Sequence, residues 1–168
     1  IEMTGVEVDT TPEHSDCVQG FFNRIYAEVK EIPLYFPGSK RRCAMIKVGL
    51  YGVTGYAGYE LLRWLRRHPQ VEVKFAVSES QAGKTLAEVY PGPLDMPLIT
   101  AEAAPLADVD AVFLALPHGA AAAAARKALH AGLRVIDLSA DFRMRTPESY
   151  KQWYAHEHPA PELLPIPY

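Results

Sequence analysis

A glycine-rich loop between a predicted strand and a predicted helix is the feature that most constrains the fold of this chain. The apolar run at residues 46–51 is typical of a buried strand, and a helical pattern with Leu61, Leu62 and Leu65 follows it. Between them, residues 52–58 read Gly-Val-Thr-Gly-Tyr-Ala-Gly. Glycines at such a junction allow a tight turn, close approach of a phosphate to the backbone, and close packing of helix on strand. The loop therefore predicts a dinucleotide-binding strand–loop–helix unit.

The spacing of this loop is GxxGxxG rather than the common GxGxxG. A purely structural turn is the alternative interpretation. The position of the loop favours phosphate binding, because the first N–H groups of a helix have no partner within the helix and attract anions. We therefore expect six residues of the loop to bind a cofactor, namely Gly52, Thr54, Gly55, Tyr56, Ala57 and Gly58.

Strands and helices alternate along the rest of the chain. Apolar runs predict three more strands, at residues 71–77, 111–116 and 133–138. An alanine-rich helix is expected from Gly119 to about His130, with Gly132 as its C-terminal cap. The stretch 81–110 reads as irregular with a short strand near Leu98, and a helix is expected after Pro147. This alternation predicts right-handed crossovers and a mainly parallel sheet, the α/β Rossmann-type doubly wound fold.

Residues 1–44 have a different character from the remainder. Five apolar residues with helical spacing predict a short amphipathic helix within this segment: Phe21, Phe22, Ile25, Tyr26 and Val29. Packing on the rest of the chain or on a neighbouring chain is one interpretation of this helix, and binding a specific partner is the other. We expect residues 1–44 to form an N-terminal extension and residues 45–168 to form an NAD(P)-binding Rossmann domain.

Composition excludes several classes of function. The net charge is −3, with 17 basic and 20 acidic residues, so we expect no nucleic-acid partner. No apolar stretch reaches the roughly 18 residues that span a bilayer, and the start of the chain lacks a signal-peptide pattern. Two cysteines, Cys17 and Cys43, make no disulfide framework, and His156 and His158 have the wrong spacing for a shared metal on a helix. We expect a cytoplasmic protein without a membrane partner or a metal.

The end of the second predicted strand should meet the adenosine ribose of a dinucleotide. An acidic residue there favours a free 2′-hydroxyl, whereas hydroxyl and basic groups favour a 2′-phosphate. Ser78 and Ser80 can donate to a phosphate and Lys84 can come near it, while Glu79 can bind the ribose or point to solvent. The segment favours NADP as the cofactor and leaves NAD open, with Ser78 and Ser80 as cofactor-binding residues.

Two further loops follow predicted strands, where ligands of doubly wound sheets bind. The first contributes four expected cofactor-binding residues: Leu116, Pro117, His118 and Gly119. The second reads Asp-Leu-Ser-Ala-Asp-Phe-Arg at residues 137–143, and its arginine suits a phosphate or carboxylate. We expect Ser139, Asp141 and Arg143 to bind substrate; the alternatives are a structural ion pair and an Asp141 that only orients Arg143.

Together with the segment at residues 153–163, these three motifs resemble the N-acetyl-gamma-glutamyl-phosphate reductases over about residues 45–168. Aspartate-semialdehyde dehydrogenases share the glycine loop but match the other motifs less well. The resemblance implies an NADPH-dependent oxidoreductase of arginine biosynthesis, which reduces N-acetyl-glutamyl 5-phosphate to the semialdehyde and releases phosphate. It also implies a cysteine nucleophile in an Asn-Pro-Gly-Cys segment, which this chain does not contain.

The resemblance therefore implies a Rossmann domain that stops before the catalytic cysteine segment, with no catalytic residue among those present. We expect the chain to bind nucleotide weakly and to be inactive alone, and the full-length enzyme to be a homo-oligomer with a small acyl phosphate as its substrate. Two alternatives stay open. One is a non-catalytic nucleotide-binding or interaction module, and the other is a reductase of a carrier-linked aminoadipyl phosphate in lysine biosynthesis.

Overall fold

The computed structural model describes residues 45–164, and the helix predicted within residues 1–44 lies outside this part. A parallel sheet of five strands forms its centre, in the order β3-β2-β1-β4-β5. The strands are β1 (Ile46–Tyr51), β2 (Val71–Val77), β3 (Leu98–Ile99), β4 (Ala111–Leu114) and β5 (Arg134–Asp137). This order matches five of the six strands of a doubly wound dinucleotide-binding fold, so the predicted fold class is confirmed.

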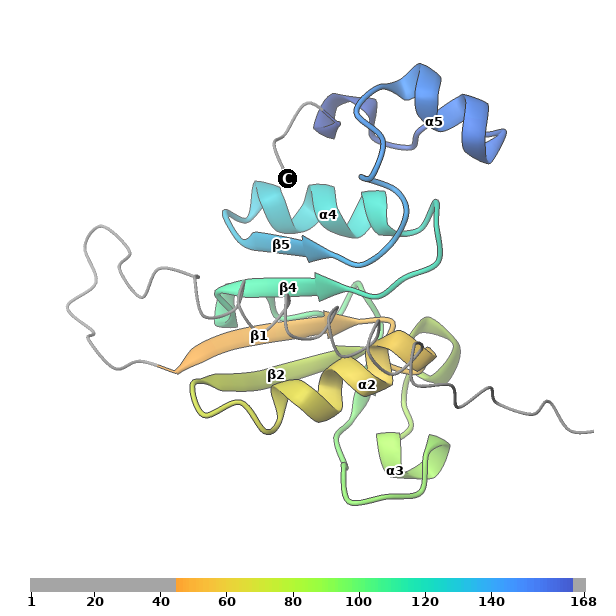
Figure 1. Ribbon diagram of the computed structural model, residues 1–168. Coiled ribbons are helices and arrows are strands. Elements are labelled where there is room, and N and C mark those ends of the chain that lie inside the picture. The colour runs from red at the N-terminus through yellow and green to blue at the C-terminus, as the bar shows by residue number, and fades with distance from the viewer. Residues whose placement is uncertain (1–44, 165–168) are drawn as a thin grey trace, which may run out of the picture. The chain divides into compact units, whose positions relative to one another are not determined.

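Helices cover both faces of the sheet (Figure 1). The helices are α2 (Tyr56–Leu65), α3 (Leu86–Val89), α4 (Ala121–His130) and α5 (Pro147–Tyr154), and the 3₁₀ helices are η1 (Glu79–Gln81), η2 (Leu106–Asp108) and η3 (Pro161–Leu163). The chain leaves β1 towards β2 and leaves β4 in the opposite direction, towards β5. Right-handed crossovers in opposite directions place α2 and α4 on opposite faces. The order of strands reverses between β1 and β4, where ligands of this fold bind.

The core follows from the alternation of side chains along the strands. Tyr51, Phe75 and Leu114 face α4 and pack against its alanines in one buried cluster. On α2, Leu61, Leu62 and Leu65 share one helix face and are buried. β4 is buried along its whole length and reads as a continuous apolar run, whereas β2 alternates in its first half, because Glu72 and Lys74 are exposed.

The structure corrects some predicted boundaries. The third predicted strand ends at Leu114 rather than at residue 116, so Ala115 and Leu116 belong to the loop that follows it. The stretch expected to be irregular contains the helix α3, which begins with a capping box between Thr85 and Glu88. A helix of four residues carries too little apolar periodicity to be recognised from sequence.

The last described elements lie beyond the β5 edge of the sheet, beside α4 (Figure 1). The hydroxyl of Thr146 accepts a hydrogen bond from the N–H of Ser149 and caps α5, which begins at Pro147. Ala155 ends this helix in the left-handed conformation, with φ of 58°. Over residues 45–164, the structure has no helix with the length and apolar character of a membrane span.

Candidate functional site

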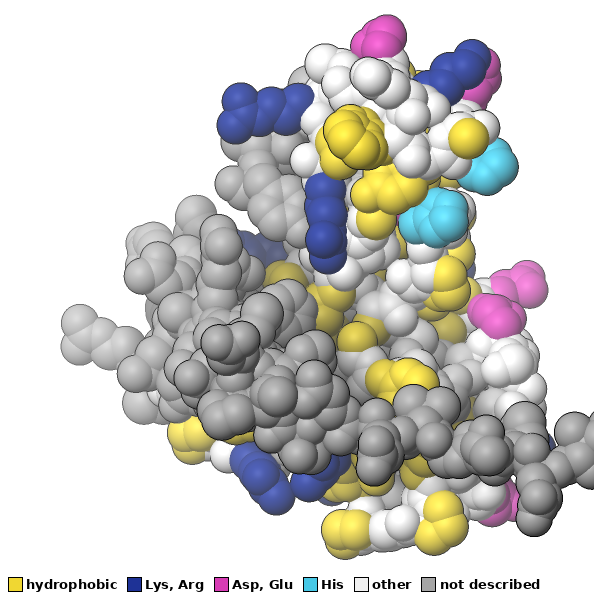
Figure 2. All heavy atoms as spheres, turned by 45° about the vertical axis from the view of Figure 1, so that its right-hand side comes forward, with side chains coloured by type: hydrophobic (Ala, Val, Ile, Leu, Met, Phe, Trp, Pro, Cys, Tyr) yellow, Lys and Arg dark blue, Asp and Glu magenta, His cyan; other side chains and the backbone are white. Residues whose placement is uncertain are grey.

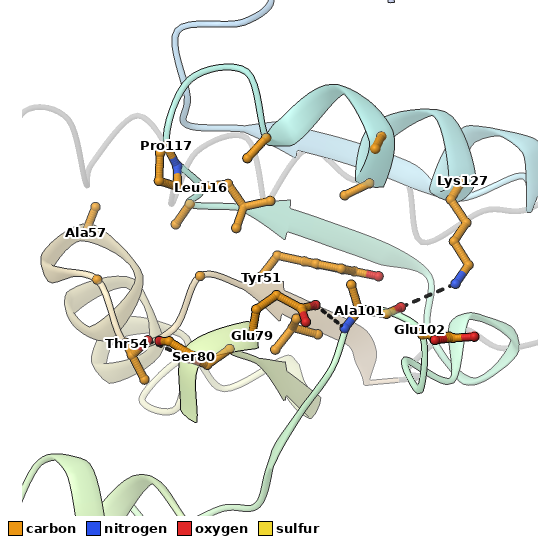
Figure 3. A pocket seen from close by; sticks show the side chains of 18 of the residues that line it. Tyr51, Thr54, Ala57, Glu79, Ser80, Ala101, Glu102, Leu116, Pro117 and Lys127 are labelled. Carbon is orange, nitrogen blue, oxygen red and sulfur yellow. Dashed lines mark hydrogen bonds between the residues drawn. The ribbon is translucent and has the colours of Figure 1, made fainter. Parts of the chain in front are cut away.

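A pocket of about 880 Å³ opens at the carboxyl ends of β1, β2 and β4, beside the start of α2 (Figure 3). It lies at the point where the strand order reverses, as expected for a ligand site of this fold. Nine predicted cofactor-binding residues line it: Gly52, Thr54, Gly55, Tyr56, Ala57, Ser78, Ser80, Leu116 and Pro117. Ten further residues complete the lining: Tyr51, Val77, Glu79, Ala101, Glu102, Ala115, Ala120, Ala123, Ala124 and Lys127.

Two glycines of the loop are required by close packing. Gly52 has φ of +76°, and a Cβ there would lie 2.2 Å from the carbonyl oxygen of Ala115. A Cβ at Gly58 would lie 2.1 Å from the carbonyl oxygen of Gly52. Gly58 therefore allows α2 to approach the turn, and it does not line the pocket. Its contact role matches the third glycine of a dinucleotide loop, which serves packing rather than phosphate contact.

The start of α2 is open towards the pocket. Gly55 is the N-cap residue, and within residues 45–164 no side chain caps the first N–H groups of this helix. Tyr56 and Ala57, the first two helical residues, line the pocket, and Tyr56 is 94% exposed. Uncapped N–H groups at a helix start carry partial positive charge and bind phosphate. The glycine cradle and the uncapped helix start therefore fit the pyrophosphate of a dinucleotide.

The end of β2 supplies one buried and one open serine. Ser78 is buried and its hydroxyl shares a hydrogen bond of 2.7 Å with the hydroxyl of Thr54, which ties β2 to the glycine loop. Ser80 is exposed and lines the pocket. Glu79 accepts a hydrogen bond of 2.7 Å from the N–H of Ala101. Glu79 thus binds the loop after β3 in this structure, rather than pointing to solvent.

The basic group at the pocket is Lys127 rather than Lys84. The ammonium of Lys84 donates to the side chain of Gln81 at 2.9 Å, and Lys84 does not line the pocket. Lys127 lines the pocket from α4 and donates to the carbonyl of Ala101 at 3.3 Å (Figure 3). The sequence did contain a signal for it, because the four pocket-lining residues of this helix have the spacing i, i+3, i+4 and i+7: Ala120, Ala123, Ala124 and Lys127.

Some residues of the turn after β4 line the pocket, and others lie towards α5. Leu116 and Pro117 line the pocket, whereas His118 and Gly119 do not. The ring of His118 stacks on Tyr154 with 5.5 Å between centroids, and lies 6.3 Å from the ring of His156. Figure 2 shows histidine side chains gathered beside hydrophobic ones at the end of the molecule that carries α5. In this structure His118 contacts α5, so cofactor contact by His118 and Gly119 stays a prediction.

Asp141 is fully buried and holds this turn in place. Its Oδ1 accepts the N–H of Gly119 at 2.6 Å, and its Oδ2 accepts the N–H of Ala121 at 3.1 Å. The hydroxyl of Tyr150 donates to Oδ1 at 3.2 Å, and Nε2 of His158 donates to the main-chain carbonyl of Asp141 at 2.8 Å. Burial, followed by the nearby Asp141 charge, raises the pKa of Tyr150 to about 12. Asp141 therefore caps α4 and joins it to α5.

The remaining residues of this loop are bonded among themselves. Ser139 donates to Asp137 through its hydroxyl at 2.7 Å and through its N–H at 3.0 Å. Burial raises the pKa of the Asp137 carboxyl, and the hydrogen bonds from Ser139 oppose this rise. Nε of Arg143 donates to the carbonyl of Ser139 at 3.1 Å, and Arg143 is exposed. Ser139, Asp141 and Arg143 lie outside the pocket lining, so substrate binding by these three stays a prediction.

Known proteins match the same part of the chain. A family model described as "Semialdehyde dehydrogenase, NAD binding domain" matches residues 47–164. N-acetyl-gamma-glutamyl-phosphate reductase of Azotobacter vinelandii is 51% identical over 125 residues, which are 72% of this chain and 36% of the relative. The enzyme of the same name from Ectopseudomonas mendocina is 49% identical over 124 residues, which are 71% of this chain and 36% of the relative.

A solved structure shares the fold. The aspartate semialdehyde dehydrogenase of Candida albicans, solved with NADP, matches with a TM-score of 0.54 and 18% identity. The match covers 69% of this chain and 41% of that protein. The chain thus spans a little over a third of the length of the curated relatives named above. The family model covers most of the chain, and on that ground the chain belongs to the semialdehyde dehydrogenase family, whose NAD binding domain it carries.

Proposed function

We propose that this chain is the cofactor-binding part of an N-acetyl-gamma-glutamyl-phosphate reductase and that it binds NADP(H) in the pocket at the start of α2. One observation carries the proposal. The glycine turn and the uncapped N–H groups of α2 meet in a pocket of about 880 Å³, large enough for much of a dinucleotide. The identity of about half the residues to reductases of that name supports the choice of enzyme.

The residues around the pocket have distinct roles in this proposal. The N–H groups of Tyr56 and Ala57 would hold the pyrophosphate, and the glycine at position 55 would leave room for it. Leu116 and Pro117 would exclude water from the apolar side of the site. When bound, NADPH supplies a hydride for reduction of the acyl group. Ser139 and Arg143 are proposed to bind the acyl phosphate, which the complete enzyme converts to N-acetyl-glutamate semialdehyde and phosphate.

The preference for NADP over NAD rests on the groups near the end of β2. Glu79 is engaged by the N–H of Ala101, which leaves this carboxylate less free to accept the ribose hydroxyls of NAD. Ser80 and Lys127 line the same pocket and offer donors to a 2′-phosphate. We therefore expect tighter binding of NADPH than of NADH.

Calorimetric titration of the 168-residue chain with NADPH and with NADH tests the proposal. We expect saturable binding of NADPH, weaker binding of NADH, and no binding by Gly55→Arg. A Cβ at Gly55 meets only the Gly52 carbonyl oxygen, at 3.4 Å, so the arginine can be accommodated at this exposed position while it fills the phosphate site. If neither nucleotide binds to a chain that shows a cooperative unfolding transition, the proposal is wrong.

A pair of lysine variants tests the cofactor preference. Lys127→Gln removes the positive charge that lines the pocket, and Lys84→Gln removes a charge that lies outside it. We expect Lys127→Gln to weaken NADPH binding by about fivefold and to leave NADH binding unchanged, because only NADPH carries the 2′-phosphate. Lys84→Gln should change neither affinity. Equal losses for both nucleotides would show that Lys127 does not read the 2′-phosphate.

Catalysis and assembly are separate parts of the proposal. The family's Asn-Pro-Gly-Cys segment is absent from this sequence, so we expect the chain to bind NADPH without oxidising it in the presence of the acyl phosphate.

Over the described residues, β5 pairs only with β4, and an unpaired strand edge invites association with a second copy or another segment. From the resemblance to the reductase family, and not from this edge, we propose that the complete enzyme is a cytoplasmic homo-oligomer. Sedimentation of the complete protein would test its oligomeric state.

A further inference from the structure

We infer that Tyr90 is a positioning residue for the phosphate-binding loop, acting through the peptide group between Thr54 and Gly55. The inference rests on the proposed nucleotide binding. Its hydroxyl donates a hydrogen bond of 2.7 Å to the carbonyl of Thr54, 36 positions earlier in the chain. Tyr90 does not line the pocket, so any effect on a bound nucleotide has to pass through the loop.

The peptide between Thr54 and Gly55 is held from both of its polar sides. Its carbonyl accepts the hydroxyl of Tyr90, and its N–H donates to the carbonyl of Gly52 at 3.0 Å. A peptide plane fixed at both ends cannot rotate without the loss of a hydrogen bond. The next two N–H groups, of Tyr56 and Ala57, are those proposed to hold the pyrophosphate. Their direction is therefore set in part by Tyr90.

The ring of Tyr90 joins the same loop to α2. It packs against the ring of Tyr59 in a tilted arrangement, with 4.6 Å between centroids and 37° between planes. Tyr59 lies on α2, one turn after its N-cap, and its N–H donates to the carbonyl of Gly55 at 2.9 Å. Tyr90 thus contacts the phosphate-binding loop through its hydroxyl and the helix that follows it through its ring.

Tyr90 is itself held firmly enough to serve this role. Its N–H donates to the carbonyl of Leu86 at 2.8 Å, and Leu86 is fully buried. The N–H of Leu86 donates to the carbonyl of Met96, and Leu98 of β3 donates to the carbonyl of Lys84. The segment around α3 is therefore tied to the edge strand of the sheet. An anchored tyrosine can restrict the loop, whereas a tyrosine on a free loop could not.

The matched variants Tyr90→Phe and Tyr59→Phe test the inference. Each keeps an aromatic ring in the pair, and only the first removes the hydroxyl bonded to Thr54. We expect Tyr90→Phe to weaken NADPH binding by about tenfold, because one hydrogen bond that orders the loop is lost. Adenosine 2′-monophosphate, which has no 5′-phosphate, should bind both variants as it binds the unaltered chain.

A second measurement needs no nucleotide. Hydrogen exchange should show faster exchange at the hydrogen-bonded amides of Gly55 and Tyr59 in Tyr90→Phe, with unchanged rates in β1 and α4. Unchanged exchange at these amides together with unchanged NADPH affinity would overturn the inference. A loss of affinity shared by adenosine 2′-monophosphate would also overturn it, since the defect would then not be confined to the loop. Failure of the unaltered chain to bind NADPH would instead count against the proposed function, because the exchange experiment is independent of binding.

Discussion

The carboxyl edge of the sheet has two regions that are built in opposite ways. Around the glycine loop, backbone groups stand open to a pocket, the helix start is uncapped, and the aromatic ring of Tyr56 lies in solvent. Around the turn after β4, side chains of the protein itself cap the helix start and cover the neighbouring ring. There the carboxylate of Asp141 caps α4, and the ring of Tyr154 covers His118.

The difference shows how one edge of a sheet can separate binding from stability. An uncapped helix start forgoes the capping energy of about 1 kcal/mol and keeps its N–H groups for a ligand. A capped start gains that energy and leaves those groups occupied. Changes near Gly52 should therefore affect both stability and binding, whereas changes near Asp141 should affect mainly stability.

The largest expected effect distinguishes the two glycines with left-handed backbones, one in each region. Gly52 has φ of +76° and Gly119 has φ of +80°, so alanine is strained at both. At position 52 the new Cβ would also meet the backbone oxygen of Ala115, at 2.2 Å, whereas no atom of the described residues lies within 4 Å at position 119. We expect Gly52→Ala to lower the free energy of unfolding by about 3 kcal/mol or more, and Gly119→Ala by about 1 to 2 kcal/mol.

Urea denaturation of the two variants beside the unaltered chain measures this difference. Equal losses of stability at positions 52 and 119 would mean that the turn moves away from Ala115 at little cost. Glycine would then be required at position 52 by its backbone conformation alone, and not by the close approach of the turn to the loop after β4.

The second effect concerns the carboxylate of Asp141. Its two oxygens accept the part-buried N–H of Gly119 and the buried N–H of Ala121 separately, so Asp141→Asn turns an amide NH₂ towards one of these two donors. An unsatisfied buried donor costs about 2 kcal/mol, which we expect as the loss in free energy of unfolding. The same change at the exposed Asp95 should cost less than about 0.5 kcal/mol.

Binding distinguishes this variant from changes in the glycine loop. At a temperature where Asp141→Asn stays folded, its affinity for NADPH should equal that of the unaltered chain, because the carboxylate does not line the pocket. A loss of affinity larger than the fraction of unfolded protein explains would place Asp141 in the binding machinery.

Tyr150 gives the second region a pH dependence of its own. Its pKa is about 12 in the folded protein, against an ordinary value of 10.0. Above pH 10 the unfolded chain loses this proton before the folded one does, so the stability that Tyr150 contributes is complete below pH 10 and lost as the pH approaches 12. Tyr150→Phe has no such proton, and its free energy of unfolding should fall less steeply over that window. Parallel pH profiles for the two proteins would contradict this assignment.

Much of the fold and one region of the edge were readable from the sequence. The glycine loop was predicted because local backbone geometry demands glycine there and because a strand and a helix flank it in sequence. The roles of the glycines at positions 52 and 58 follow from contacts within a few residues or with the neighbouring strand end. The contact of Gly58 is with Gly52, six positions earlier, and a local signal of this kind survives in a single sequence, whereas the contact of Gly52 with Ala115 joins distant segments.

The second region was less predictable, because its contacts join segments far apart in the chain. Asp141 bonds to Gly119, 22 positions away, and Tyr150 joins the same carboxylate from the next helix. A sequence shows a carboxylate after a strand but not whether a helix start will lie within its reach. Lys127 was overlooked for a different reason. The seven-residue spacing from Ala120 was visible, but alanines have no polar group that would indicate a ligand site.

The smallest expected effect on stability compares two exposed aromatic residues, one in each region. Tyr56 is 94% exposed and lines the pocket, whereas Trp153 is 72% exposed on α5 and does not. Replacement of either by serine should change the free energy of unfolding by less than about 0.5 kcal/mol, because each side chain is already largely in water. Tyr56→Ser should nevertheless weaken NADPH binding by about fivefold, since a bound nucleotide would cover its ring. An altered affinity in Trp153→Ser would show that the α5 region reaches the cofactor, and lost stability in Tyr56→Ser would show that its ring packs on the protein.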